Sequence, residues 1–156
     1  MKTLRWILPS ALGLIVAAIL LGRIARTRAI GISSAQAQRL VSLLQAAYAS
    51  TVAALEPTAV DASDFDERDA RAASDAEALR QGFDEVRSTL APGLSSAVAA
   101  FVDHIITARV QIAAFAINRK NRGLPDAAQA EAETEDRRNF QQNAQPVLSH
   151  LVAALS

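Results

Sequence analysis

The sequence predicts an all-α protein in which an N-terminal transmembrane (signal-anchor) helix precedes an up-down-up-down four-helix bundle. Three observations support this fold class. Apolar residues make up 51% of the chain but aromatic residues only 4%, so Ala, Leu, Val and Ile dominate, and Ala and Leu are strong helix formers. Residues 6–22 carry no charge. The remainder contains four long stretches whose apolar residues recur every three or four positions, as on one face of an α-helix.

The N-terminal apolar run has the length and the flanks of a membrane anchor. Its 17 residues, Trp6 to Gly22, span about 26 Å as a helix, slightly less than the ~30 Å core of a bilayer. Arg23 can lengthen the usable span by snorkelling. No acidic residue precedes Glu56. We expect a basic flank at 1–5, a transmembrane helix or signal anchor in the lipid bilayer at 6–25, and a basic juxtamembrane linker at 26–32.

Two other interpretations of this leader are open. The Ala35-Gln36-Ala37 sequence resembles a signal-cleavage site, so the alternative is a protein secreted after cleavage near Ala37. An organelle-targeting peptide is a minor option, because the apolar run lacks an amphipathic pattern. Basic residues on both flanks leave the orientation open. Export signals of this shape commonly place the next domain outside, so we expect a single-pass membrane protein with an extracytoplasmic, periplasmic bundle.

The bundle is predicted to occupy residues 33–156, with helices at about 33–56, 63–91, 93–122 and 125–155. Ser33 and Gln36 have the spacing of a capping box at the start of the first helix. Pro146 lies inside the fourth helix and should kink it or remove a hydrogen bond. The clearest apolar stripe, in the second helix, comprises Phe65, Ala72, Ala76, Leu79, Phe83, Val86 and Leu90. The stripe of the third helix includes Leu94, Val98, Phe101/Val102, Ile105/Ile106, Ile112 and Phe115/Ala116, and that of the fourth Phe140, Ala144, Val147/Leu148, Leu151 and Leu155.

Charge and composition exclude several classes of function. From Arg39 onward, eleven basic residues stand against sixteen acidic ones, a net charge of −5, which argues against nucleic acid as a partner. Without cysteine the chain forms no disulfide, thiolate zinc site or iron–sulfur cluster. His104 and His150 should lie too far apart along the bundle to share a metal ion. No phosphate-binding loop or catalytic motif occurs, so we expect neither an enzyme nor a bound cofactor.

Arg109 is the one charged residue on the apolar stripe of the third helix. A buried guanidinium needs a partner. With the third and fourth helices antiparallel and joined near Gly123, Glu135 or Asp136 should lie opposite. We therefore predict a buried ion pair between Arg109 and one of these acids.

Two charged clusters should meet at the end of the bundle farthest from the membrane. One cluster begins the second helix and the other ends the third. Acidic residues at the start of a helix and basic residues at its end both counter the helix dipole, so the dipole alone can explain the two clusters. Together they also form a dipolar tip on which another protein could dock. The tip residues are Asp64, Asp66, Glu67, Arg119, Lys120 and Arg122.

In layout, though not in any motif, the chain resembles the sensory modules of bacterial chemoreceptors and sensor kinases, in which an anchor is followed by a four-helix extracytoplasmic bundle. It has no second membrane pass or signalling domain, so a receptor that signals alone is not expected. Three functions are considered: a membrane-tethered accessory or scaffold protein acting through protein–protein interaction, a small-molecule sensor or carrier, and a self-associating envelope or membrane-active protein. A cavity lined by Phe83, Phe101 and Phe115 would favour the carrier. A packed core with an exposed apolar stripe would favour the accessory protein.

Overall fold

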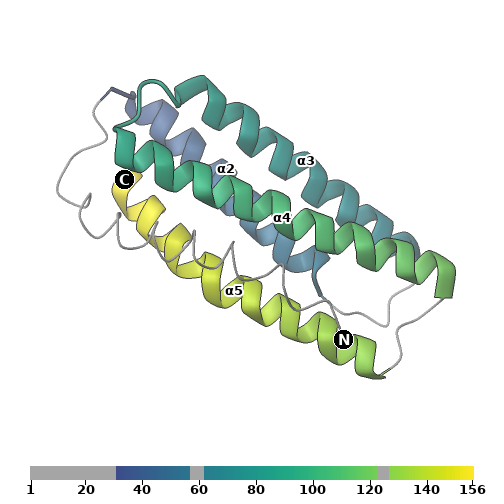
Figure 1. Cartoon of the computed structure of the whole chain (residues 1–156). Helices are drawn as coiled ribbons and strands as arrows, with labels where there is room; N and C mark the ends of the chain where they lie inside the picture. The colour runs from purple at the N-terminus through teal and green to yellow at the C-terminus, as the bar shows by residue number, and fades with distance from the viewer. Residues whose placement is uncertain (1–30, 57–61, 123–126) are drawn as a thin grey trace.

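The computed structural model describes residues 31–56, 62–122 and 127–156 (Figure 1). These residues form four helices and no strand, so the predicted all-α class is confirmed. The expected membrane helix at 6–25, the flank at 1–5 and most of the linker at 26–32 lie outside the described residues. The helices are α2 (Ser34–Ala54), α3 (Ala62–Val86), α4 (Pro92–Arg122) and α5 (Ala127–Leu155).

Successive helices run in opposite directions and share one core (Figure 1). Helix α2 packs against α3, α4 and α5, while α4 also packs against α3 and α5. The alternating directions are those of an up-down-up-down bundle. Because the number of described helices is even, the start of α2 and the end of α5 lie at the same end. A surface hollow there is lined by both Ser34 and Ser156.

Most of the core consists of the apolar stripes that the sequence pattern indicates. All seven stripe residues predicted for the second helix are buried, and so are the residues of the α5 stripe from Phe140 to Leu155. Leu79 and Leu151 have no exposed surface at all. Removal of these side chains from water stabilises the bundle. A helix of this length has no other way to bury its apolar face, so the four helices depend on one another.

Helix α2 begins at the predicted capping box, which the structure confirms. The Ser33 hydroxyl oxygen accepts a hydrogen bond from the backbone N–H of Gln36 (3.2 Å). In return, Gln36 Oε1 accepts from the backbone N–H of Ser33 (2.9 Å). Two amides that lack partners at a helix start are thus satisfied.

Helix α3 ends at Val86, five residues before the predicted end. The amides of Thr89 and Leu90 both donate to the carbonyl oxygen of Val86, at 2.9 and 3.1 Å, which closes a turn. Proline also disfavours the helical conformation at the residue before it, here Ala91. Leu90 remains buried, so it belongs to the core but not to the helix.

Pro146 does not end α5, which is continuous from Ala127 to Leu155. The proline is exposed, on the side of the helix away from the core.

Gly31 holds the start of the described chain against the turn between α3 and α4. Its φ of 114° lies in the left-handed region that favours glycine. A Cβ atom at this position would lie 2.3 Å from the carbonyl oxygen of Thr89. Any larger residue would therefore force the two segments apart.

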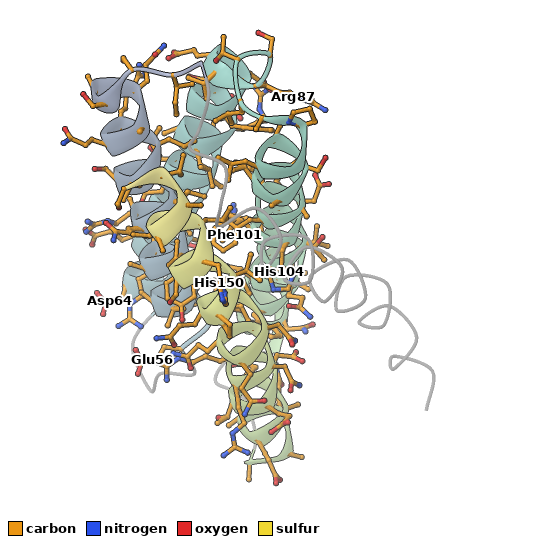
Figure 2. All side chains as sticks on the ribbon, turned by 90° about the vertical axis from the view of Figure 1, so that its left-hand side faces the viewer. Glu56, Asp64, Arg87, Phe101, His104 and His150 are labelled. Carbon is orange, nitrogen blue, oxygen red and sulfur yellow. The ribbon has the colours of Figure 1, made fainter. Side chains whose placement is uncertain are left out.

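The four helices differ in length, which leaves one end of the bundle thinner. Helix α4 has 31 residues and α2 only 21, so α4 is longer by about 15 Å at 1.5 Å per residue. Figure 2 shows α4 and α5 continuing together beyond Glu56, past the end of α2. The last turns of α4 therefore have fewer neighbours to cover their apolar side chains.

The capping box yields a test of the fold. Replacing Ser33 with Ala should lower the free energy of unfolding by about 1 kcal/mol, because the N–H of Gln36 loses its acceptor. Ser34→Ala is the control, since this exposed residue follows the cap as the first residue of α2 and Ala is the stronger helix former. Denaturant titration of both variants measures the difference. Equal stability of the two variants would contradict the assigned cap.

Candidate functional site

Helix α4 carries an apolar stripe on its outer face. Within the described chain, Ile106, Val110 and Ile117 are the exposed large hydrophobic residues, and 42%, 68% and 59% of their surfaces are accessible. Ala113, between them, is also exposed. Isolated exposed apolar residues are ordinary, but a contiguous group on one helix face is typical of an interaction site. We call these four residues the α4 stripe.

The α4 stripe corrects the prediction for Ile106, which the sequence pattern placed with Ile105 on the core face. The structure buries Ile105 but leaves Ile106 exposed. Consecutive helical residues point about 100° apart, and the core of this bundle accommodates only one of the two. Val110 and Ile117 were not predicted as surface residues. Their spacing from Ile106, at positions four and eleven, is the signal that could have revealed them.

Because it is apolar on two faces, α4 contains a segment, Pro92–Phe115, that is long and apolar enough to cross a membrane by length and composition alone. In the structure this segment packs against the other three helices. Its inner face supplies buried core residues, among them Val98 and Ile112. The core and the stripe together account for its apolar character.

The aromatic residues named for a ligand cavity are packed into the core instead. Phe101 has no accessible surface and Phe83 only 3%. Their rings therefore do not border a space that water can enter. Phe115 is partly buried and packs against the same core. The bundle interior around Phe83 and Phe101 is filled by side chains.

Arg109 pairs with Asp69 of α3, which replaces the predicted pair with Glu135 or Asp136 of α5. The guanidinium Nη1 donates to the Asp69 carboxylate and to the Asp69 backbone oxygen at 3.0 Å. Both side chains are largely shielded from water. Asp69 and Arg109 each lie twenty residues from Thr89, in the turn between the two helices. The sequence separation thus places the two residues opposite each other. The same reasoning also sets Arg109 opposite residues of α5, because α4 packs against both helices, and spacing alone does not decide between them.

The two acids expected to bind Arg109 have other surroundings. Glu135 is exposed and accepts a hydrogen bond from Arg138 at 3.4 Å. Asp136 is half-buried, and burial together with the nearby charges of Glu135 and Glu133 raises the pKa of its carboxyl. Glu133 itself is almost fully buried.

The predicted docking tip is described in part. Asp64 forms an ion pair with Arg68 across one helical turn, at 3.5 Å. Asp66 and Glu67 are exposed. Helix α4 extends to Arg122 and ends at the same end of the bundle at which α3 begins (Figure 1). The side chains of Arg119, Lys120 and Arg122 lie outside the described part, so the dipolar tip stays a prediction.

An aromatic stack joins α2, α4 and α5 at mid-height. The His104 ring lies nearly parallel to that of Phe140, with centroids 5.0 Å apart. The Tyr48 ring also stacks on Phe140, with centroids 5.8 Å apart. Both His104 nitrogens are buried and have no hydrogen-bond partner among the described residues. Burial lowers the pKa of His104 from 6.5 to about 4. The imidazole is therefore neutral at pH 7 and serves as a packing ring.

His150 is exposed and contacts the carbonyl oxygen of Pro146 through Nδ1 at 2.7 Å. It thus lies apart from the stack that contains His104. Over the described residues, no three His, Asp or Glu side chains are grouped to hold a metal ion.

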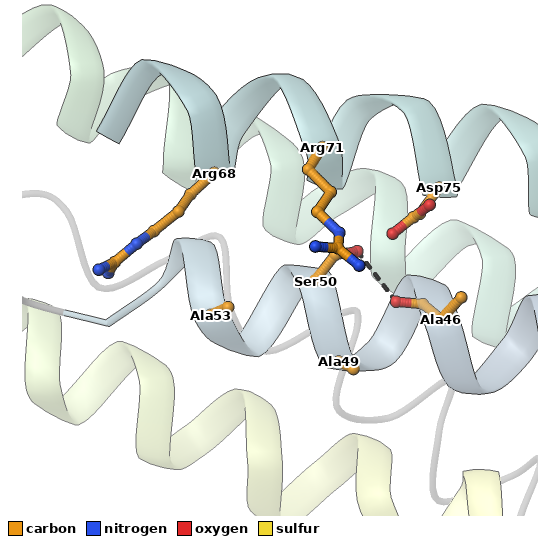
Figure 3. A pocket seen from close by; sticks show the side chains of 7 residues that line it. All are labelled: Ala46, Ala49, Ser50, Ala53, Arg68, Arg71 and Asp75. Atoms are coloured by element: carbon orange, nitrogen blue, oxygen red, sulfur yellow. Dashed lines mark hydrogen bonds between the residues drawn. The ribbon is translucent and has the colours of Figure 1, made fainter. Parts of the chain in front are cut away.

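A surface hollow of about 300 Å³ lies between α2 and α3. Figure 3 shows its lining: Ala46, Ala49, Ser50 and Ala53 of α2, and Arg68, Arg71 and Asp75 of α3. The hollow exists because alanine side chains are too short to fill the space between the helices. The Ser50 hydroxyl donates to the carbonyl oxygen of Ala46 at 3.0 Å, so it is already engaged.

Comparison with known proteins adds no family to these observations. No family model, no curated protein and no solved structure matches this chain.

The assignment of Asp69 to Arg109 can be tested by a double-mutant cycle. Asp69→Ala and Arg109→Ala should each destabilise the bundle, because each leaves the other charge partly buried and unpaired. The loss in the double variant should be smaller than the sum of the two single losses by about 1 kcal/mol or more. Denaturant unfolding measures each term. The same cycle with Glu135→Ala serves as control and should show no coupling; coupling to Glu135 but not to Asp69 would reverse the assignment.

The buried histidine predicts a pH-dependent stability. The folded state disfavours protonated His104, whereas the unfolded chain binds the proton below pH 6.5. Protonation of His104 therefore leaves the free energy of unfolding unchanged above pH 6.5. Below that pH it lowers the free energy of unfolding as the pH falls towards 4, by up to about 3 kcal/mol. The carboxylates titrate in the same window, so the comparison is with His104→Phe, which keeps a ring but cannot titrate. Lowering the pH from 7 to 4 should reduce the free energy of unfolding of the wild type more than that of this variant. His150→Gln, the control, should follow the wild type, and parallel profiles for all three would refute the assignment.

Proposed function

We propose that this chain is a membrane-tethered helical accessory protein that acts by protein–protein contact through the α4 stripe. The observation that carries the proposal is the exposure of Ile106, Val110 and Ile117 on a bundle whose core around Phe101 is already filled. Contact with another surface removes an apolar face of this kind from water, which is favourable. The core needs none of the stripe residues, since Ile105 and Ile112 occupy the inner face.

The tether in this proposal is the uncharged segment within residues 6–25, which is long enough to cross a bilayer. The bundle would lie on the extracytoplasmic side. Gly31 and the first turn of α4 are at the same end of the bundle. Ile106 lies fourteen residues beyond Pro92, about 21 Å along the helix. A bundle standing on its tether would hold the stripe away from the lipid, where a protein can reach it.

The charged tip adds a second element to the proposed docking face. Its basic residues follow Ile117 in the last turn of α4, and its acidic residues lie in the first turns of α3, at the same end of the bundle (Figure 1). Polar and charged residues around an apolar centre are the usual composition of an interface rim. The α4 stripe would then supply the apolar part and the tip the charged part.

The hollow between α2 and α3 supports a second candidate, binding of a small molecule. Its volume of about 300 Å³ is at the lower limit for ligand pockets. The two arginines in its lining would suit an anionic group. Its floor consists of alanines and an engaged serine, which offer little recognition. The accessory function therefore has the stronger support.

Val110→Glu tests the accessory function in the full-length chain. Membranes from cells expressing the tagged protein are cross-linked, washed at alkaline pH and solubilised. The wild type should stay with the membranes and yield a defined cross-linked species. Val110→Glu should stay membrane-bound and helical but lose most of that species, about tenfold or more, because a buried carboxylate is costly.

Ser74→Glu on the exposed face of α3 is the matched control, since it introduces the same charge away from the stripe. This variant should behave as the wild type. Undiminished cross-linking of Val110→Glu would remove the stripe from the interface, and release of the wild type by the alkaline wash would contradict the tether.

A further inference from the structure

The α4 stripe has the spacing of a helix that pairs with another helix. Its residues Ile106, Val110, Ala113 and Ile117 are separated by four, three and four positions. This is the heptad alternation of a coiled-coil seam, in which each side chain enters a gap between residues of the facing helix. The seam covers the twelve residues from Ile106 to Ile117, or about 16 Å of helix.

The seam is complementary to itself when the chain direction is reversed. Positions equally distant from the midpoint between Gln111 and Ile112 then face each other. Ile106 faces Ile117 and the large Val110 faces the small Ala113. In each layer, one helix contributes the first heptad position and the other helix the fourth, which is the layer pattern of antiparallel pairs.

The charges that flank the seam favour the same direction. The exposed Asp103 lies three residues before Ile106. In the antiparallel register it falls opposite position 120, three residues after Ile117, which is a lysine. A parallel pair would instead set Asp103 against Asp103 and Lys120 against Lys120. Opposite charges across an interface stabilise one register and penalise the other.

The immediate sides of the seam are small or neutral. Thr107 and Ala114 flank it on one side, and both are exposed. Arg109, on the other side, is directed to Asp69 of α3 and does not obstruct an approaching helix. Two copies of α4 can therefore come close together.

We propose that the α4 stripe binds the same stripe of a second copy of this chain, as an antiparallel pair centred between Gln111 and Ile112. This inference rests on the proposed function and names its partner. A twofold axis relates the two copies, so every contact occurs twice. The two Gly31 ends then lie at opposite ends of the pair. The tethers of such a dimer enter two facing bilayers, or one bilayer along which the pair lies flat.

The chain contains no cysteine, so introduced cysteines report the pairing directly. The full-length protein is purified in detergent, and Val110→Cys and Ala113→Cys chains are oxidised separately and as an equal mixture. The mixture should give at least threefold more disulfide-linked dimer than either chain alone, since residue 110 faces residue 113. Stronger linkage of Val110→Cys with itself would indicate a parallel pair and overturn the proposal.

A charge exchange tests the register independently. Asp103→Lys and Lys120→Asp should each weaken dimerisation roughly tenfold, because each replaces two attractive contacts with repulsive ones. The double variant should regain most of the wild-type affinity. Light scattering over a concentration series measures the dimer fraction, and circular dichroism verifies helicity. Glu131→Lys on the exposed face of α5 is the control for Asp103→Lys, with the same change of charge. Failure of the double variant to recover would overturn the register.

Failure of this inference is distinguishable from failure of the proposed function. A monomeric wild type whose cross-linked species in membranes still depends on Val110 would assign the stripe to a different protein. A monomer in which a cysteine at Val110 links to one at Ile15 of the same chain would assign it to the leader. Either result overturns the dimer, and only the first preserves the accessory function.

Discussion

The structure depends on the burial of one apolar stripe per helix, because no helix of this chain can remove its stripe from water alone. Burial of a Leu, Ile or Phe side chain contributes about 1.5–3 kcal/mol relative to exposure. The loss of conformational freedom offsets most of that gain. Phe101 and Leu44, which have no exposed surface, therefore matter only as members of a core to which all four helices contribute. The unequal helix lengths limit this cooperation. Where α2 ends at Ala54, α4 and α5 continue with less cover.

The sequence predicted the core of α3 and α5 closely, for a simple physical reason. Each of these helices is polar except for one stripe, so only one orientation buries its apolar residues. Phe83 and Leu151 could therefore be assigned from spacing alone, and both are buried. Helix α4 is apolar on two faces, and periodicity does not determine which of them faces inward. Ile106 was misplaced for this reason, and the candidate site went unrecognised.

The spacing of residues also leaves open which neighbouring helix a long side chain faces. The register that sets Glu135 or Asp136 opposite Arg109 also sets His104, five residues earlier, close to Phe140, and these two rings do stack. Arg109 nevertheless pairs across the α3 interface. A helix in a bundle has two neighbours at each level, and a long side chain can turn towards either. The choice depends on side-chain packing, which the linear pattern does not encode.

The common location of the first and last described residues bears on how the chain could be rewired. Ser34 and Ser156 line one hollow, so a short peptide could join the two ends without crossing the bundle. The chain would then be opened in a loop between two other helices, which would provide the new termini, as in circular permutation. In such a rearranged chain any segment fused to a new terminus would extend from the far end of the bundle. The helices would keep their neighbours while the attached segment changed ends.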